Sequence, residues 1–316
     1  MKYLFFDIEC SNCFDGVGKI CEFGYVLTDE NLKVIKASDI PMSPGKGKEA
    51  RFHLKGRKHE KDLELAYEYD YYFSQPEFPF FYKQIKSLLE DKDTICFAYS
   101  MDNDISHLYH TCKRYHMKPF NFECYDIQKI AAEYLKRKGG MALSNVCREI
   151  AGPNSCISLQ EHLSRDDAEM ERLILESICI LTKSDSKALL EQSSYARTNS
   201  SKWIDDFILR KKKKRMKAIG YNLYKSLVVS ESKIDEPENV GRRYNLSGKL
   251  KTDLKALEAT TKFIQSNNGI FSDQICKSDY FIVRDDADKE KMLKSFKYPF
   301  EGKILTYQEL LNTMSA

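Results

Sequence analysis

The sequence has no hydrophobic run long enough to span a membrane. A spanning helix needs about 20 consecutive apolar residues, and charged side chains interrupt the apolar stretches of this 316-residue chain well before that length. The N-terminal stretch MKYLFFDIEC does not form a secretory signal either, because Asp7 and Glu9 end its apolar part after four residues. We therefore expect a cytoplasmic protein that makes no contact with a membrane.

The sequence also lacks a dense cysteine framework. Its ten cysteines are scattered along the chain, a pattern typical of reduced thiols in the cytosol. Cys10, Cys13 and Cys21 lie close together, but no second Cys or His pair follows at the spacing of a zinc finger. We expect free thiols and no structural zinc.

An excess of charge of one sign is absent as well. The formal net charge is +3, and hydrophobic residues make up 42% of the chain. This apolar fraction is sufficient to bury a core, which excludes wholesale disorder and collagen-like or mucin-like chains. At about 100–200 residues per domain, the length favours two domains.

The pattern of apolar residues predicts an α/β fold from residue 1 to about 185. Three strands come first and strands then alternate with helices, the last of them a long helix over residues 166–192. This order indicates a mixed sheet flanked by helices, with an antiparallel early part. Residues 186–240 change in composition and are interpreted as a linker, and a fresh alternation over 241–316 predicts a smaller α/β domain.

Residues 44–76 interrupt the first pattern. Seven Lys or Arg residues lie between Lys46 and Lys61, and five aromatic residues follow between Tyr67 and Phe73. One interpretation is a nucleic-acid grip, with basic groups for phosphates and rings for stacking. The other is a solvated loop followed by a packed aromatic turn, which the interspersed acidic residues favour.

A dense basic run lies in the linker. Residues 210–217 include seven basic residues in eight, and without these seven charges the net charge of +3 would become −4. One interpretation is a sequence-independent contact with a nucleic-acid backbone. The other is a solvated helix face or an extended tether. The residues proposed for the backbone contact are Lys211, Lys212, Lys213, Lys214 and Arg215.

Two acidic residues, Asp7 and Glu9, stand at alternate positions in the first predicted strand. Because side chains alternate along a strand, both carboxylates emerge on one face, while Phe6 and Ile8 face the other way. Two neighbouring carboxylates raise each other's pKa unless a cation neutralises them, and Mg²⁺ prefers such oxygen ligands. Surface strands also carry such pairs, but the apolar neighbours argue against a solvated edge.

Two further acidic clusters lie where strands end or helices begin. Asp102 and Asp104 follow the apolar strand TICFAYS, at the place where sites of α/β sheets occur, or they cap a helix. His162 stands five residues before Asp167, at the start of the long helix. The imidazole could swing toward a water and the carboxylate toward a metal; alternatively, Asp166 and Asp167 only complement the helix dipole.

In this order and spacing the sequence resembles the DEDDh exonucleases, the DnaQ-like group that includes the proofreading subunit of bacterial DNA polymerase III. The resemblance covers about residues 1–185, with supporting matches in CEFGYVL and YDIQKIA, and it implies an RNase H-like sheet. The matched positions are Asp7 and Glu9 in FDIE, Asp104 in DNDISHL, and His162 with Asp167 in HLSRDD.

The resemblance further implies phosphodiester hydrolysis assisted by two divalent ions, Mg²⁺ or Mn²⁺. Asp7 would bridge both ions, Glu9 and Asp167 would complete the first site, and Asp104 would hold the second. His162 would accept the proton of the attacking water. The expected products are 5′-mononucleotides released from a 3′ end.

Residues 241–316 resemble a BRCT domain, similar to the one that ends bacterial NAD-dependent DNA ligases, in LSG, the NNG turn, KSDYFIV and the final YQELL. In phosphate-binding members, a Ser or Thr after the first strand and a Lys in the second helix grip the phosphate. Ser247 and Lys291 match those positions, and a strand-to-helix turn offers suitable backbone N–H groups. The alternative is a module for protein docking or packing.

Together these features predict a 3′→5′ exonuclease domain (1–185), a basic linker (186–240) and a BRCT-like domain (241–316) that binds a replication or repair protein. We expect DNA as the substrate because of the BRCT-like domain, since the catalytic residues serve both polymers. One alternative is an RNA-trimming exoribonuclease. A second is a DNA-tethering adaptor with an inactive nuclease domain, against which the intact catalytic set argues.

Overall fold

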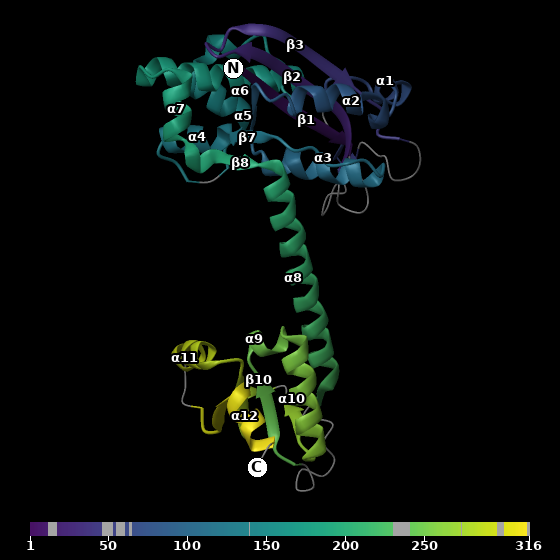
Figure 1. Cartoon of the computed structure of the whole chain (residues 1–316), viewed down its shortest axis with the longest axis vertical. Helices are drawn as coiled ribbons and strands as arrows, with labels where there is room; N and C mark the ends of the chain where they lie inside the picture. The colour runs from purple at the N-terminus through teal and green to yellow at the C-terminus, as the bar shows by residue number, and fades with distance from the viewer. Residues whose placement is uncertain are drawn as a thin grey trace. The chain divides into compact units, whose positions relative to one another are not determined.

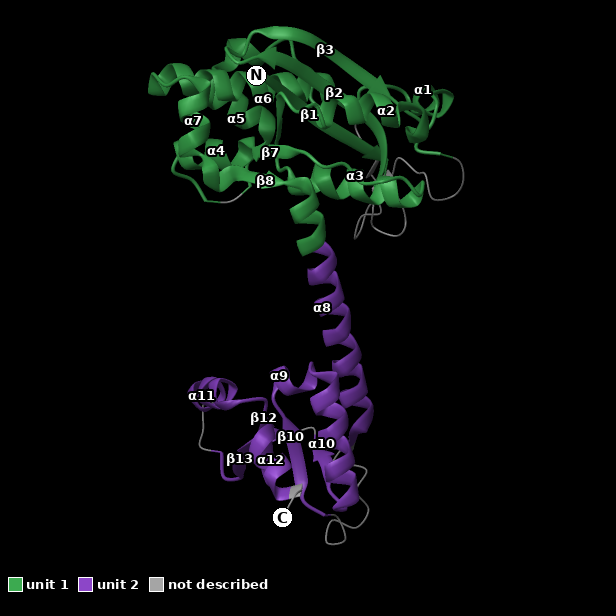
Figure 2. Ribbon diagram, in the orientation of Figure 1, with its two compact units in different colours: residues 1–206 green, residues 207–316 purple. Residues whose placement is uncertain are grey.

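The computed structural model describes residues 1–11, 18–45, 53–54, 61–62, 65–138, 140–229, 241–272, 274–295 and 300–314. The chain divides into two compact units, coloured separately in Figure 2: unit 1 is Met1–Asp206 and unit 2 is Phe207–Ala316. Within the described ranges, no helix has the length and apolar character needed to cross a bilayer.

Unit 1 is built on a six-stranded mixed sheet with the order β3-β2-β1-β6-β7-β8 (Figure 1). The strands β3, β2 and β1 are antiparallel neighbours, β6 and β7 continue parallel to β1, and β8 closes the edge antiparallel to β7. This arrangement confirms the predicted fold class. The strands are β1 Lys2–Ser11, β2 Lys19–Asp29, β3 Val34–Pro41, β6 Thr94–Ala98, β7 Glu123–Asp126 and β8 Arg197–Asn199.

Helices cover both faces of this sheet, and alternate side chains of each strand point to opposite faces. On one face, Tyr3 and Phe5 of β1 pack in a core with apolar side chains of α4, α5 and α6. On the other face, the ring of Phe6 contacts the rings of Phe23 and Phe122. The helices of unit 1 are α1 Tyr69–Ser74, α2 Phe78–Leu89, α3 Asp102–Arg114, α4 Ile127–Tyr134, α5 Leu143–Ile150, α6 Ser164–Thr182 and α7 Ser186–Gln192.

The helix predicted over residues 166–192 is two helices, α6 and α7. Lys183 ends α6 with a left-handed backbone, at φ +53°. Asp185 then caps α7, because its carboxylate accepts the N–H of Ala188 at 2.7 Å. The apolar period continues through both helices, so periodicity alone could not show the break.

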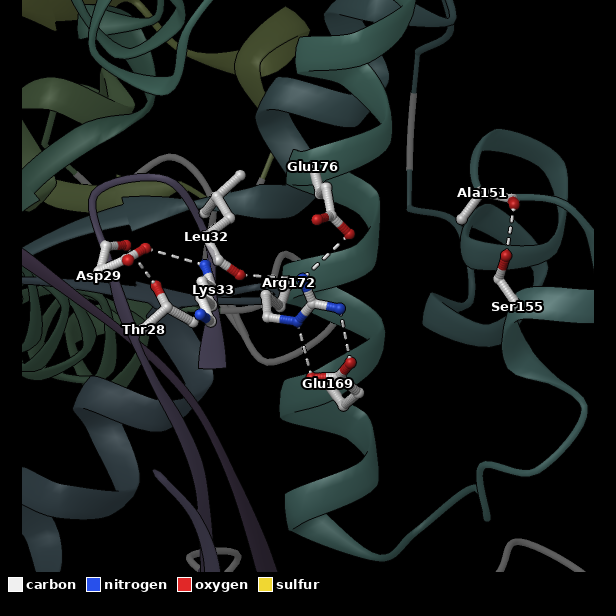
Figure 3. Close-up of polar contacts among 9 residues, drawn as sticks. All are labelled: Thr28, Asp29, Leu32, Lys33, Ala151, Ser155, Glu169, Arg172 and Glu176. Carbon is white, nitrogen blue, oxygen red and sulfur yellow. Dashed lines mark hydrogen bonds and ion pairs between the residues drawn. The ribbon is translucent and has the colours of Figure 1, made fainter. Parts of the chain in front are cut away.

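A buried arginine fixes α6 to the turn between β2 and β3 (Figure 3). The guanidinium of Arg172 donates to the carbonyl oxygen of Leu32 at 3.1 Å and forms ion pairs with Glu169 and Glu176. A buried charge is tolerated only when it is paired and hydrogen-bonded in this way. The position of α6 over the sheet is therefore defined by polar contacts as well as by apolar packing.

The boundaries predicted at residues 185 and 241 differ from those of the two units. Leu189 and Leu190 of α7 enter the core of unit 1, and β8 pairs with β7, so residues 186–206 belong to unit 1. The long helix α8 (Ser200–Leu227) and the strand β9 (Val228–Val229) follow. A composition rich in Ser and Asn hides these pairings, because backbone hydrogen bonds do not depend on side-chain polarity.

Unit 2 contains a five-stranded sheet of order β13-β12-β10-β11-β9, in which every neighbouring pair is parallel. Its core includes Leu246, Leu257 and Ile264. The remaining elements are β10 Arg243–Leu246, α9 Gly248–Lys251, α10 Leu254–Ser266, β11 Ile270–Ser272, β12 Tyr280–Val283, α11 Asp286–Ser295, β13 Lys303–Thr306 and α12 Tyr307–Met314.

Two cysteines depart from the expectation of free thiols. Cys147 in α5 and Cys156 in the following 3₁₀ turn form a disulfide, while seven other cysteines of the described ranges are free. The expectation was wrong for this pair because the turn after α5 brings two buried thiols together, which scattered sequence positions do not reveal.

The insert at residues 44–76 is described only in part. Its basic side chains between Lys46 and Lys61 lie outside the described residues, although the short strands β4 (His53–Leu54) and β5 (Lys61–Asp62) pair with each other. Its aromatic part forms α1, in which Tyr72 is buried and its ring meets that of Tyr67 edge to face. Tyr71 and Phe73 are each 43% exposed, so the aromatic turn is packed only in part, and neither interpretation of the insert is decided.

Candidate active site

Asp7 and Glu9 lie on the face of β1 that is covered by α6. Earlier on the same face, Tyr3 and Phe5 belong to the apolar core, so this face changes from apolar to acidic toward the C-terminal end of the strand. The pairing with β2 contains a β-bulge directly after Glu9. Bulges often redirect side chains beside active sites.

The helix α3 brings a third carboxylate to this edge of the sheet. Because β6 is the parallel neighbour of β1, both strands end at the same edge, and α3 begins shortly after β6. Asp104 in its first turn is only 4% exposed, and its charge raises the pKa of Asp7. Asp102 is exposed and accepts the indole N–H of Trp203 at 2.7 Å. Asp104, and not Asp102, therefore joins the cluster.

The loop before α6 and its first turn supply His162 and Asp167. Nδ1 of His162 lies 3.1 Å from Oε1 of Glu9, and the backbone N–H of His162 donates to Asp167 at 3.1 Å. The backbone of His162 is left-handed, at φ +65°, a conformation that residues other than glycine rarely adopt. The neighbouring Asp166 accepts the backbone N–H of Gln160 at 2.9 Å and so holds the loop instead of facing the cluster.

Burial and mutual repulsion raise the pKa values of the clustered carboxyl groups. The pKa of Asp7 lies well above its usual range because of burial and then the charge of Asp104, and that of Asp104 is raised chiefly by burial. Burial and the charge of Glu9 raise the pKa of Asp167 to about 7. The hydrogen bond to Glu9 raises the pKa of His162 to about 9. The cluster thus retains protons at neutral pH unless another cation neutralises it.

These side chains fit divalent cations. Ligand atoms of Glu9, His162 and Asp167 all lie within 4.8 Å of one another, a separation at which one ion can contact several of them. Asp7 adds a half-buried carboxylate and Asp104 a buried one, and their raised pKa values indicate a lack of positive charge nearby. Carboxylate oxygens are the ligands that Mg²⁺ and Mn²⁺ prefer.

The stability of the metal-free protein should fall as the pH rises from about 5 to about 8.5. The pKa of Asp167 is about 7 instead of 3.8, and that of His162 is about 9 instead of 6.5, so the folded state binds both protons more tightly than the unfolded chain. The contribution of these two groups to the free energy of unfolding is complete at a pH below their pKa values in the unfolded chain. It is lost as the pH rises through their pKa values in the folded protein.

Thermal unfolding measured with chelator, Mg²⁺ or Mn²⁺ at each pH tests this expectation. The ions should raise the unfolding temperature more at about pH 8.5 than at about pH 5, where they compete with protons for the same carboxylates. A metal-induced shift that is independent of pH would contradict the assignment of these groups to a cation site.

A glycine in β2 allows α6 to approach the carboxylates. Gly24 is the cross-strand partner of Asp7, and a Cβ atom at this position would overlap the backbone of Ser164 and Arg165. Any larger residue must therefore push away the segment that begins α6. This glycine belongs to the segment CEFGYVL. A glycine is required here by the packing of α6 on β2 and not by the conformation of β2 itself.

The substitution Gly24→Val should lower the rate of any reaction at this site by about 100-fold, because displacements of about 1 Å at a catalytic group have effects of that size. Gly140→Ala is a matched control in unit 1, since a Cβ there meets only the end of Gln128 at 4.0 Å. Steady-state kinetics and thermal unfolding of both variants check this, and a fully active Gly24→Val would show that the position of α6 is unimportant.

Two acidic residues near the site were missed in the sequence. Glu22 lies across from Glu9 in the β1–β2 register; its buried carboxylate accepts the N–H of Ser164 at 2.6 Å and the hydroxyl of Tyr72 at 2.5 Å. Burial and the charge of Asp39 raise its pKa to about 8. Glu22 thus holds the start of α6 in place, a role that hairpin register could have suggested.

Glu171 is the second missed residue, and it lies one helical turn after Asp167 on α6. It is fully buried, and Oε1 accepts the backbone N–H of Tyr99 at 2.8 Å. Its pKa is raised well above the usual range by burial and then by the charges of Asp7 and Asp104. The spacing of four residues on a helix was the available signal.

The two residues predicted for phosphate binding in unit 2 differ in exposure. Lys291 is exposed and lines a cavity of about 630 Å³ together with Gly248 and Lys249. The hydroxyl of Ser247 is buried, donates to Asp288 and accepts the N–H of Leu250 as the cap of α9. The Ser247 hydroxyl is thus engaged within the fold.

The basic run lies on α8, within unit 2, and all five of its predicted residues are exposed. Lys211 lies over the ring of Phe207, with its ammonium 4.5 Å from the ring centroid. Lys212 and Lys213 instead line a cavity of about 410 Å³ with Thr252 of unit 2. The run therefore forms part of a folded helix and not an extended tether.

Neither the family models nor the curated protein sequences match this chain. Among solved structures, it is similar to a 3′-exonuclease that recognises a histone mRNA stem-loop, with 14% identity and a TM-score of 0.44 over 58% of this chain and 65% of that one. It is similar to E. coli Exonuclease I in complex with a dA16 oligonucleotide, with 13% identity and a TM-score of 0.46 over 60% of this chain and 42% of that one.

A third similar structure is the nuclease domain of 3′hExo, a DEDDh family member bound to rAMP. It has 15% identity and a TM-score of 0.44, over 58% of this chain and 94% of that one. The chain spans less than two thirds of the first two proteins. Identity is 15% or lower and the TM-score below 0.5 in all three.

Proposed function

We propose that this protein is a metal-dependent 3′→5′ exonuclease that hydrolyses DNA to 5′-mononucleotides. The observation that carries the proposal is the convergence of five side chains from three separate parts of the chain. Asp7 and Glu9 come from β1, Asp104 from α3, and His162 and Asp167 from the start of α6. Hydrogen bonds and the mutual effects of their charges on pKa values link these side chains into one site.

The four carboxylates would hold two divalent ions, Mg²⁺ or Mn²⁺. Such ions, when bound, lower the pKa of a water and stabilise the leaving 3′ oxygen. The protein contributes a rigid frame for this chemistry. Glu22 and Arg172 anchor the beginning and the middle of α6, and Gly24 allows its close approach to β1.

His162 is the proposed general base, since a histidine can take the proton of an attacking water. Its side chain is about half exposed, at 51%, whereas the carboxylate of Glu9 is mostly covered. While the imidazole is paired with Glu9 its pKa is about 9, so at neutral pH it carries a proton. Neutralising the charge of Glu9 removes the cause of that shift and leaves an imidazole able to accept a proton.

Residues 241–316, which make up most of unit 2, are proposed to be the BRCT-like domain, and the small all-parallel sheet to which their strands belong supports this proposal. We propose that this domain docks a replication or repair protein and keeps the nuclease near DNA. The choice of DNA rests on this domain alone. For a phosphate contact at Ser247 and Lys291, the serine would have to exchange its bond to Asp288 for one to the phosphate.

An end-labelled substrate assay tests the proposed function. The protein is incubated with single-stranded DNA, duplex DNA and RNA, each in Mg²⁺, in Mn²⁺ and in chelator. We expect mononucleotides from DNA with metal and none with chelator. Release from RNA alone would assign the alternative exoribonuclease function. Absence of release from every substrate would refute the enzyme and favour the adaptor.

A further inference from the structure

Unit 2 contains a continuous groove built from two neighbouring cavities. One, of about 410 Å³, lies along α8, and the other, of about 630 Å³, lies between α8, α9 and α11. Lys217 and Thr252 line both cavities, which makes them parts of one surface. The lining residues of the first are Leu209, Lys212, Lys213, Met216, Lys217 and Thr252.

The groove is positively charged along its length. Five lysines line it, from three different elements. The acidic lining residue is Asp288, which is buried and accepts the hydroxyl of Ser247 and the N–H of Arg284. At the rim, Asp285 forms an exposed ion pair with Lys249 at 2.6 Å. The five lysines are Lys212, Lys213 and Lys217 of α8, Lys249 of α9 and Lys291 of α11.

The helix α8 packs closely on α9 beside the groove. A Cβ at Gly220 would overlap the carbonyl of Lys251, so the two helices touch backbone to backbone there. One turn later, the hydroxyl of Tyr224 contacts Asn245 at 3.2 Å, and the ammonium of Lys251 lies 4.0 Å from the ring centroid of Tyr224. The backbone positions that carry the lysines of α8 and α9 are therefore fixed relative to each other before any ligand binds.

Helical spacing arranges the lysines of α8 in a row. Lys213 and Lys217 are four residues apart and therefore lie on one side of the helix, one turn of about 5.4 Å from each other. Leu209 and Met216 supply apolar surface between the charges. A row of point charges with apolar surface suits a repeating anion whose sugars can cover that surface, as in a nucleic-acid backbone.

A single phosphorylated side chain fits the groove less well. Recognition of one phosphate needs a focused cradle of hydroxyl and N–H donors, and the buried hydroxyl of Ser247 is engaged with Asp288. The charges are instead distributed over two cavities and three helices. We propose that this groove binds the sugar–phosphate backbone of a nucleic-acid strand without regard to sequence, as a binding site separate from the catalytic carboxylates.

This inference deepens the proposed function, because it names the surface of unit 2 that would hold the substrate polymer. It also narrows the sequence prediction for the basic run. Lys212 and Lys213 face the groove together with Lys217, which was not among the predicted residues. Lys211 instead lies over the ring of Phe207.

The test is the salt dependence of binding by the full-length protein. A fluorescent oligonucleotide is titrated in chelator, which prevents hydrolysis, between about 50 and 200 mM salt. The slope of log K against log salt is negative, and each lost phosphate contact reduces its magnitude by about 0.7 to 0.9. The double variant Lys213→Gln/Lys217→Gln should therefore reduce the magnitude of the slope by about 1.5. The control Lys225→Gln/Lys255→Gln removes two exposed lysines of unit 2 outside the groove and should leave the slope unchanged.

The outcomes separate this proposal from the proposed function. If both double variants have the same slope and the protein releases mononucleotides with Mg²⁺, the groove proposal is wrong and the proposed function stands. A slope of smaller magnitude for the groove variant, in a protein that releases no mononucleotide, would support the groove and refute the exonuclease. Loss of binding to a phosphoserine peptide in the groove variant, with an unchanged nucleic-acid slope, would assign the groove to phosphopeptides and overturn the proposal.

Discussion

Replacing Asp7 by Asn should reduce mononucleotide release to background while the protein stays folded. Burial and then the charges of Asp104, Glu9 and Asp167 raise the pKa of Asp7. Without metal, the Asp7 carboxyl must either hold a proton that it would lose in the unfolded chain or carry a charge beside other carboxylates. The neutral amide avoids both costs, so the metal-free variant should unfold at a higher temperature than the wild type. It should also lose most of the stabilisation by Mg²⁺ or Mn²⁺, because an amide is a poor substitute for a carboxylate ligand.

Asp104→Asn and Asp102→Asn form a matched pair for the same experiment. Asp104 is buried in the cluster, and its variant should be as inactive as Asp7→Asn. Asp102 holds the indole of Trp203, and Asn preserves an oxygen that can accept that bond, so its variant should stay active. Activity in Asp7→Asn, or the reverse order within the pair, would show that these carboxylates do not hold the catalytic ions.

Replacing His162 by Ala should lower kcat by about 100- to 10,000-fold, the range for loss of a general base. KM should change little, because the carboxylates that hold the ions remain. In the wild type, kcat should rise with pH as the imidazole loses its proton, and the variant should lack this ionisation. NMR titration of His162 should show a pKa near 9 in chelator and a lower value in Mg²⁺.

A control distinguishes a lost base from a disturbed loop. The residue at position 162 has a left-handed backbone, so His162→Asn retains a residue type that tolerates this conformation but removes the base. Both variants should be slow, and both should bind Mg²⁺ in thermal unfolding. A His162→Asn variant with the wild-type rate and pH profile would show that the imidazole takes no proton in the reaction.

Much of the site could be predicted because local geometry determines it. The two-residue period of a strand places Asp7 and Glu9 on one face whatever the rest of the chain does. The order of strands and helices also follows from local apolar patterns, and in unit 1 the observed sheet agrees with it. The five candidate residues came from this reasoning together with the family resemblance.

The details that could not be predicted depend on how elements pack and turn in space. The family resemblance already favoured Asp104 over Asp102, but the contact that holds Asp102 away, with Trp203 about 100 residues later, could not be predicted. The disulfide, which was missed, depends on a turn that joins Cys147 to Cys156. The break at Lys183 separates two stretches with a common apolar period. None of these three features leaves a pattern in the neighbouring residues, because each depends on how whole elements pack.

By itself the sequence determined which acidic residues and which histidine were available, and on which face of the first strand two of them lie. The tertiary structure decided that they meet, and that Gly24, Glu22 and Arg172 hold α6 over them. It also decided that lysines of α8, α9 and α11 share one groove. The physical reason is that backbone periodicity is a property of neighbouring residues, whereas burial, raised pKa values and grooves arise only when distant segments pack together.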